Sequence, residues 1–226
     1  SLQGLLSAWL APWVQALGLR VEAFADGEVT LRLPQSDQLS RVGGMLCGQA
    51  MMAAADRVTI EITGRGGHGA HPYQTVDPVL VAAHTITAVQ SIVSRNVKPV
   101  DSAVISLCAV QAGDLSAMSV VPNSASIVGT VRTFKPEVQS LVERRLHDLC
   151  MAVAQGFGAT AKVTFERMYP ATINTAAEAQ FAGDVAASIV GEENLTRTLE
   201  PSMGAEDFSF MLQVKPGAYL RLGQGT

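Results

Sequence analysis

The stretch VTIEITGRGGHGAHPYQTVDP, residues 58–78, contains the signals that decide the fold of this chain. Its first six residues alternate between apolar and polar side chains, which is the pattern of a strand with one buried face. A glycine-rich loop with two histidines follows. Asp77 and Pro78 then form a favourable helix start, because aspartate is a good N-cap and proline suits the first helical position.

The helix that begins at Pro78 is predicted to end near Asn96, and its apolar residues recur at helical spacing: Val79, Ala83, Ile86, Val89 and Val93. The segments SAVISLCAVQAG and SASIVGTVRTF predict two further strands. Pro136 opens a second helix with one apolar stripe, which comprises Val138, Leu141, Val142, Leu146, Leu149 and Val153. AKVTFERM predicts the last strand of this region.

The predicted order is therefore strand, helix, strand, strand, helix, strand. This is the order of ferredoxin-like folds, in which two helices cover one face of a four-stranded antiparallel sheet and leave the other face free. The predicted fold class is α/β, of the α+β type.

Patterns on either side of this unit predict further elements. Residues 2–17 have helical apolar spacing, and the segment after them predicts two strands joined at Asp26 and Gly27. The small-residue, Met-rich segment VGGMLCGQAMMAAADR, residues 42–57, predicts a helix. Towards the C-terminus we predict a helix around residues 176–190, a short helix through Met211 and a strand in GAYLRLG.

The composition limits the classes of partner. The 226 residues have a net charge of −4 with both signs interspersed, so no basic surface for nucleic acid or anionic lipid is predicted. A small molecule or a protein is the expected partner.

Cys47, Cys108 and Cys150 are far apart in apolar surroundings, which predicts buried free thiols in a cytoplasmic protein. Neither a signal peptide nor a membrane span is predicted, since the N-terminal segment lacks a basic start and is interrupted by Pro12.

The glycine-rich loop admits several interpretations. Gly64, Gly66 and Gly69 match G-x-G-x-x-G, but the helix does not begin at the glycines and no acidic residue lies in residues 78–100, so nucleotide binding is disfavoured. His68 and His71 lack the spacing of four that a helical zinc site needs. His68 is well placed to donate a hydrogen bond to a carbonyl oxygen as it gains negative charge. The alternative is a loop imidazole that caps local backbone groups.

Arg132, Glu206 and Asp207 are further candidates. Arg132 shares a strand face with Thr130 and Ser126, where its forked guanidinium is suited to a carboxylate. The alternative is a solvated arginine paired with Glu166 or a similar residue. Glu206 and Asp207 precede a predicted short helix, and the helix dipole alone could explain acidic residues there.

From about Met51 onwards the chain resembles the metal-dependent amidohydrolases of the aminoacylase and carboxypeptidase family, which include hippurate hydrolases. The segments that carry this resemblance are ADRVTIEITGRGGHGAHPYQTVDP, SAVISL, VVPNSASIVGTVRTF, YPATIN and EPSMGAEDFSFML. The resemblance implies that the ferredoxin-like region is a lid that pairs two subunits, and that the substrate is a small N-acyl amino acid. It also implies that His68 is catalytic and assists the scissile carbonyl, that Arg132 binds the substrate carboxylate, and that Gly204 and Glu206 line the active-site cleft.

The departures from the family pattern concern the metal. Members of this family use Zn or Mn, whose ligands are a Cys-Gly-His-Asp segment, a pair of glutamates and further histidines. None of these segments occurs here, so we expect no metal ligands in this chain and little activity from the chain alone. Ser119 also stands where the family carries an asparagine.

Residues 1–56 resemble the opening of a hotdog-fold thioesterase, although Val42 replaces the common histidine before the paired glycines. We therefore expect three domains: a hotdog-like segment over 1–56, a ferredoxin-like lid over 57–167 and an incomplete catalytic segment over 168–226. The chain would be truncated or chimeric, with a junction between Met51 and Asp56. The alternatives are a non-catalytic dimerisation module that pairs through its lid, and an acyl-CoA thioesterase that uses Gln49 and Asp56.

Overall fold

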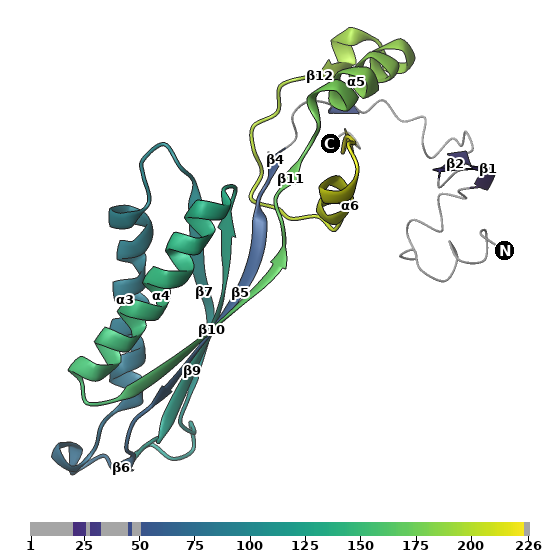
Figure 1. Ribbon diagram of the computed structural model, residues 1–226. Coiled ribbons are helices and arrows are strands. Elements are labelled where there is room, and N and C mark those ends of the chain that lie inside the picture. Colours follow the sequence, from purple (N-terminus) through teal and green to yellow (C-terminus); the bar gives the residue numbers. More distant parts are fainter. Residues whose placement is uncertain (1–19, 26–27, 33–44, 47–50, 224–226) are drawn as a thin grey trace. The chain divides into compact units, whose positions relative to one another are not determined.

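The computed structural model of the chain describes the following residues: 20–25, 28–32, 45–46 and 51–223 (Figure 1). The chain divides into two units, residues 1–44 with 222–226 and residues 45–221. In the first unit, β1 (Arg20–Ala25) and β2 (Glu28–Arg32) pair antiparallel. This confirms the predicted hairpin. The helix predicted for residues 2–17 lies outside the described residues, as do Val42, Cys47 and Gln49.

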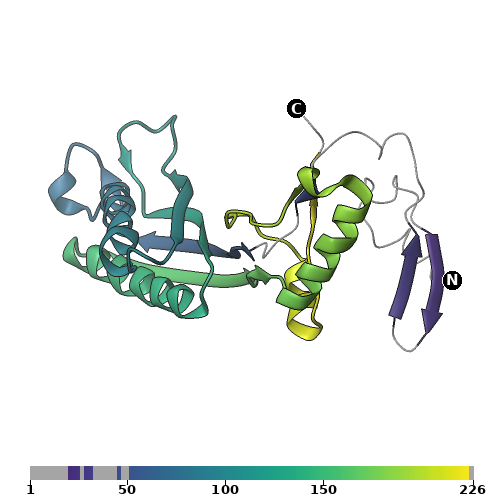
Figure 2. The same cartoon turned by 90° about the horizontal axis from the view of Figure 1, so that it is seen from above.

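The second unit contains the predicted four-stranded antiparallel sheet, whose order is β10-β5-β9-β7. Its strands and helices are, in chain order, β5 (Ala54–Thr63), α3 (Pro78–Asn96), β7 (Ala103–Ala112), β9 (Ser124–Thr133), α4 (Pro136–Gly156) and β10 (Thr160–Tyr169). Figures 1 and 2 show α3 and α4 side by side on one face of this sheet. The α/β fold class is thereby confirmed. Residues 54–169 are called the ferredoxin-like unit below.

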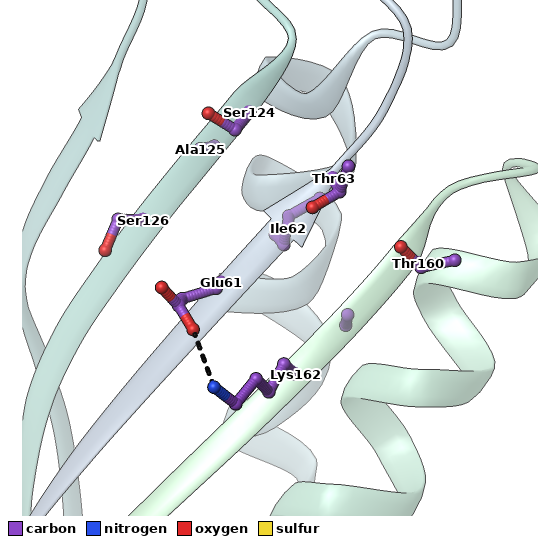
Figure 3. A pocket seen from close by; sticks show the side chains of 9 residues that line it. Glu61, Ile62, Thr63, Ser124, Ala125, Ser126, Thr160 and Lys162 are labelled. Atoms are coloured by element: carbon purple, nitrogen blue, oxygen red, sulfur yellow. Dashed lines mark ion pairs between the residues drawn. The ribbon is translucent and has the colours of Figure 1, made fainter.

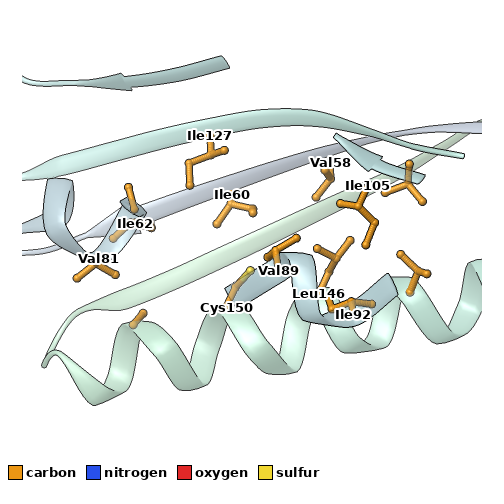
Figure 4. Packing of buried hydrophobic residues seen from close by; sticks show 14 of the residues in the cluster. Val58, Ile60, Ile62, Val81, Val89, Ile92, Ile105, Ile127, Leu146 and Cys150 are labelled. Carbon is orange, nitrogen blue, oxygen red and sulfur yellow. The ribbon is translucent and has the colours of Figure 1, made fainter. Parts of the chain in front are cut away.

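The core of this unit lies between the sheet and the two helices (Figure 4). The strand alternation predicted at residues 58–62 is confirmed, because Val58, Ile60 and Ile62 are completely buried. From α4, Val142 and Leu146 are completely buried against them. Full burial of such a side chain stabilises the fold by roughly 1.5–3 kcal/mol.

The helix starts follow the sequence signals, but the buried face of α3 agrees with the prediction only in part. The Asp77 carboxylate accepts a hydrogen bond of 2.8 Å from the Val79 amide, as expected of an N-cap. Val89 is completely buried as predicted, and Ile86 and Val93 pack partly buried against the core, but Val79 is 47% exposed. The other buried residues of the helix are Val81, Ala82, Thr85 and Ile92. Apolar residues surround this helix on most sides, so periodicity alone did not fix its orientation.

The helix predicted over residues 42–57 is wrong. The described part of this segment forms β3 (Met45–Leu46), β4 (Met51–Met52) and the first residues of β5. Alanine and methionine favour helices intrinsically, but Ala55 pairs with Arg132 on one side and with Tyr169 on the other. Pairing within the sheet therefore overrides local propensity here.

The C-terminal elements follow the prediction more closely. α5 (Ala176–Val190) and the short α6 (Phe208–Val214) are confirmed, and the predicted final strand is reduced to β13 (Arg221–Leu222). β11 (Thr172–Ile173) pairs with β4, whereas β12 (Leu195–Thr196) runs parallel to β3 in the three-stranded order β12-β3-β13. A turn of 3-10 helix, Glu192–Asn194, connects α5 to β12.

The described cysteines differ in their surroundings. Cys150 is completely buried as predicted, and burial raises the pKa of its thiol to about 12. Cys108 lies exposed on β7, so the prediction that it is buried is wrong. Within the described part of the chain, every helix is too short or too polar to cross a bilayer.

Candidate functional site

His68 lies in the loop between β5 and α3, on an exposed two-residue strand, β6 (Gly67–His68). This strand pairs with β8 (Val120–Val121), and the short 3-10 helix Pro72–Gln74 follows it. The His68 ring lies 5.8 Å from the ring of His71, centroid to centroid, and the ring of His71 lies 6.0 Å from that of Tyr73. The loop thus presents a row of three exposed rings.

The hydrogen bond that His68 makes is local. Its Nδ1 accepts the backbone N–H of Ala70 at 3.1 Å, which leaves Nε2 free of backbone contacts among the described residues. The alternative interpretation, in which the imidazole caps backbone groups of its own loop, is therefore correct for Nδ1. The other nitrogen is still available for a ligand.

Arg132 lies half-buried in β9, on the sheet face opposite the two helices. Its neighbours on that face are Ala55 from β5 and Val104 from β7. The pairing with Glu166 that the sequence allowed does not form, because Glu166 lies 3.9 Å from the guanidinium of Arg57 instead. Among the described residues no ion pair neutralises Arg132.

Gly204 and Glu206 lie in the loop that leads into α6, within unit 45–221. The nearby Ser202 carbonyl accepts the Ala53 amide at 3.0 Å, so this loop runs beside the start of β5. A Cβ atom on Gly204 would lie 3.0 Å from the terminal methyl of Met52, which makes the contact tight. Burial, and after it the negative charge of Glu206, raises the pKa of Tyr219, whose hydroxyl donates a hydrogen bond to Glu206.

The fold brings some of these residues together and separates others. Arg132 pairs with Ala55, and the Ser202 loop bonds to Ala53 two residues earlier on the same chain segment. The loop of His68, in contrast, is bonded through its Gly66 amide to Asn123, which directly precedes β9. Asn123 and Arg132 lie at opposite ends of β9. At 3.3 Å per residue, the distance between them along the strand is roughly 30 Å.

Two shallow pockets lie elsewhere on the ferredoxin-like unit. The first has a volume of about 270 Å³ and lies on the helix-free face, where Glu61 of β5 and Lys162 of β10 form an ion pair of 3.6 Å across neighbouring strands (Figure 3). The second, of about 310 Å³, lies between α4 and β10 beside His147. None of the four predicted site residues lines either pocket.

Two polar features were not predicted from the sequence. Asn123 accepts hydrogen bonds from the histidine loop through both its side chain and its backbone. The buried Asp56 accepts hydrogen bonds of 2.9 and 2.8 Å from the Gln139 amide, one to each carboxylate oxygen. A charged residue on the buried face of a strand needs a buried polar partner, so Asp56 could have indicated this contact. The signal was missed because residues 42–57 were predicted to form a helix.

Comparison with known proteins identifies the family. The chain matches the model of Peptidase family M20/M25/M40 over residues 16–226, and it belongs to this family. The match includes most of residues 1–56, and no comparison supports the resemblance of that segment to a hotdog-fold thioesterase. The strands at Met51–Met52 and Ala54–Thr63 replace the central helix that such a fold would need.

Curated relatives and solved structures agree with this assignment. Hippurate hydrolase of Campylobacter jejuni is 39% identical over 75% of this chain and 44% of its own length. N-acetylcysteine deacetylase of Bacillus subtilis is 34% identical over 76% of this chain and 44% of its own length. The Bacillus subtilis YXEP protein, described as a dinuclear metal binding peptidase of the M20 family, is 29% identical with a TM-score of 0.61, over 80% of this chain and 45% of that one.

The chain thus spans less than half the length of these relatives. No group of three or more His, Cys, Asp or Glu side chains in residues 51–223 or in the shorter described segments is arranged to hold a metal ion.

Proposed function

We propose that this chain carries the substrate-contacting part of a hydrolase that acts on the amide bond of N-acyl amino acids such as hippurate. Family membership and the names of the hippurate hydrolase and deacetylase relatives support this class of reaction. The observation that carries the proposal is the state of Arg132. It is half-buried and has no ion pair among the described residues, whereas Arg57 on the same face is paired with Glu166.

Each of the four site residues has a role in this proposal. The Arg132 guanidinium binds the substrate carboxylate through two parallel N–H donors. The Nε2–H group of His68 donates to the carbonyl oxygen of the scissile amide, where negative charge develops. Gly204 allows close approach of the loop before α6, and Glu206 with its Tyr219 partner lines the cleft.

The separation of His68 and Arg132 supports a homodimer. The carbonyl and the carboxylate of an N-acyl amino acid lie within about 4 Å of each other, since one residue spans only about 3.8 Å. The loop of His68 is bonded to Asn123, and Asn123 lies roughly 30 Å along β9 from Arg132, so the two side chains of a single chain cannot contact the same small substrate. We therefore propose that His68 serves the site of a second subunit, and that the edge strand β7 and helix α3 form the interface.

The proposal extends to domains and metal. Residues 57–167 form the lid, and residues 168–226 belong to a catalytic domain that the chain contains only in part. Zn or Mn serves the reaction in the complete enzyme, but the described residues do not supply its ligands. We therefore expect little hydrolysis by this chain alone.

Calorimetric titration with hippurate tests the assignment of Arg132. The chain should bind hippurate, and Arg132→Ala should weaken binding about 10- to 100-fold, because hydrogen bonds between charged groups contribute roughly 1.5–3 kcal/mol. The matched control is Arg57→Ala, on the same sheet face, which should leave binding unchanged. Equal losses in both variants would contradict the role of Arg132.

A non-catalytic dimerisation module is the second candidate. The open edge of β7, with its exposed residues and its irregular register between Leu107 and Ala109, favours this function. Light scattering coupled to size exclusion separates the two. A dimer that binds no hippurate and shows no turnover when Zn or Mn is added supports the module and contradicts the hydrolase.

A further inference from the structure

The loop that carries His68 is closed at its base by backbone hydrogen bonds. The amide of Arg65 donates to the Val76 carbonyl, and the amide of Val76 donates to the Arg65 carbonyl, both at 2.9 Å. The Arg65 side chain adds a bond of 3.0 Å from Nε to the Gln74 carbonyl. A Cβ atom on Gly64 would lie 2.1 Å from the Val76 carbonyl oxygen, so this closure requires glycine.

Asn123 fixes the side of the loop nearest the sheet. Its side-chain oxygen accepts the Gly66 amide at 2.9 Å, and its backbone carbonyl accepts the Gly64 amide at 2.9 Å. A Cβ atom on Gly66 would lie 2.5 Å from the Val121 carbonyl oxygen and 2.9 Å from Oδ1 of Asn123. Any side chain at position 66 would therefore displace this contact.

The backbone around His68 is also satisfied within the protein. The His68 carbonyl accepts the His71 amide at 2.9 Å, and the Gly69 amide donates to the Ser119 carbonyl at 2.7 Å. The Ala70 amide then points at the imidazole and donates to its Nδ1 at 3.1 Å. The ring orientation is thus set by an amide whose own position is fixed on both sides.

A neutral imidazole carries one N–H and one acceptor nitrogen. Because Nδ1 of His68 accepts a hydrogen bond from Ala70, its proton must be on Nε2. We propose that the Ala70 amide holds neutral His68 in the Nε2–H tautomer, and that Asn123 is the positioning residue that keeps the loop in this arrangement. This inference rests on the proposed function, in which His68 donates through Nε2 to the substrate carbonyl.

His71 serves as an internal comparison. Its ring contacts those of His68 and Tyr73, but no hydrogen bond to either of its nitrogens occurs among the described residues. The two histidines lie in the same loop, and both are exposed to solvent. A difference between their tautomers therefore reports the Ala70 contact rather than the general environment.

Heteronuclear NMR of the full chain with 15N-labelled histidine tests the proposal at about pH 8.5, where an ordinary imidazole is neutral. His68 should show Nε2–H almost alone, whereas His71 should show signals averaged between the two tautomers. Asn123→Ala and Gly66→Ala should shift the His68 nitrogen signals towards those of His71. Asn123→Asp should keep the wild-type pattern, since its carboxylate oxygen can still accept the Gly66 amide.

The matched control for Gly66→Ala is Gly156→Ala, where a Cβ atom would meet nothing within 4 Å. This variant should leave the His68 signals unchanged. A mixture of tautomers at His68 in the wild type would overturn the proposal, as would an unchanged His68 in both Asn123→Ala and Gly66→Ala. The measurement needs no substrate, so failure of the hippurate titration would refute the proposed function without affecting this result.

Discussion

The helices of the ferredoxin-like unit and helix α5 use their apolar residues in opposite ways. α4 buries Val142 and Leu146 completely, whereas α5 buries only small residues, including Ala179 and Ala186. Its large residues Phe181, Val185 and Ile189 recur every four positions and are exposed, Phe181 and Ile189 by 72% each. The ferredoxin-like unit therefore supplies both sides of its own core, while no described residue covers the large apolar face of α5.

This difference indicates which part of the chain carries its stability. An exposed stripe of large apolar residues on one helix face is typical of a surface that contacts another molecule or another segment. The same residues contribute little to the fold as described. Substitutions in the two regions should consequently have very different effects.

The largest effect is expected for Leu146→Ala in the core of the ferredoxin-like unit. Removal of this completely buried side chain leaves a cavity and should lower the free energy of unfolding by about 2–5 kcal/mol. The matched substitution in α5, Ile189→Ala, should change it by less than about 0.5 kcal/mol. Urea denaturation measures both, and similar losses would show that α5 is covered after all.

Substitution of Asp56 should have an intermediate effect. Asp56→Ala leaves the buried amide of Gln139 without its acceptor and should cost about 1–3 kcal/mol. Burial, opposed by the Gln139 hydrogen bonds and the charge of Arg167, raises the pKa of Asp56 above 3.8, and the charge of Glu143 acts in the same direction as burial.

The sign of the pH dependence follows from this shift. Since the folded state holds the Asp56 proton more tightly, its contribution to stability falls as the pH rises from 3.8 through the raised pKa. Asp56→Asn removes the titrating group, so it should flatten this decline. Thermal unfolding across the acid range gives the comparison. A steeper decline in Asp56→Asn would contradict it.

The smallest effect is expected on the helix-free face of the sheet. Glu61 and Lys162 form an ion pair of 3.6 Å, but both side chains are largely exposed. Exposed pairs contribute little because solvent screens them, so Lys162→Ala should change the stability by less than about 1 kcal/mol. Urea denaturation at low and high salt tests this, and a loss comparable to that of Leu146→Ala would contradict it.

The fold could be predicted from the sequence wherever a pattern was local and unambiguous. The alternation at Val58, Ile60 and Ile62 and the Asp77-Pro78 start gave the correct strand and helix, and the order of elements gave the sheet. The α3 face was predicted only in part, with Val89 buried but Val79 exposed, because apolar residues surround that helix. The helix over residues 42–57 was mistaken because strand pairing with residues far along the chain decides the conformation there.

The candidate site likewise has a part that could be predicted from the sequence and a part that could not. The loop of His68 and the strand of Arg132 were predicted from their own neighbours in the sequence. The contacts that position them were not, since Asn123 lies 57 residues from Gly66 and Gln139 lies 83 residues from Asp56. Such contacts form only in the packed fold, and no local sequence pattern predicts them.

Residue-resolved hydrogen exchange of the full chain tests the central claim most directly, namely that the ferredoxin-like unit is the self-contained part of this protein. Amides of β5, β9, α3 and α4 should exchange most slowly, near the limit of global unfolding, whereas those of α5 and α6 should exchange much faster. Protection of α5 equal to that of β5 and α4 would contradict the claim, because it would require a cover over Phe181 and Ile189.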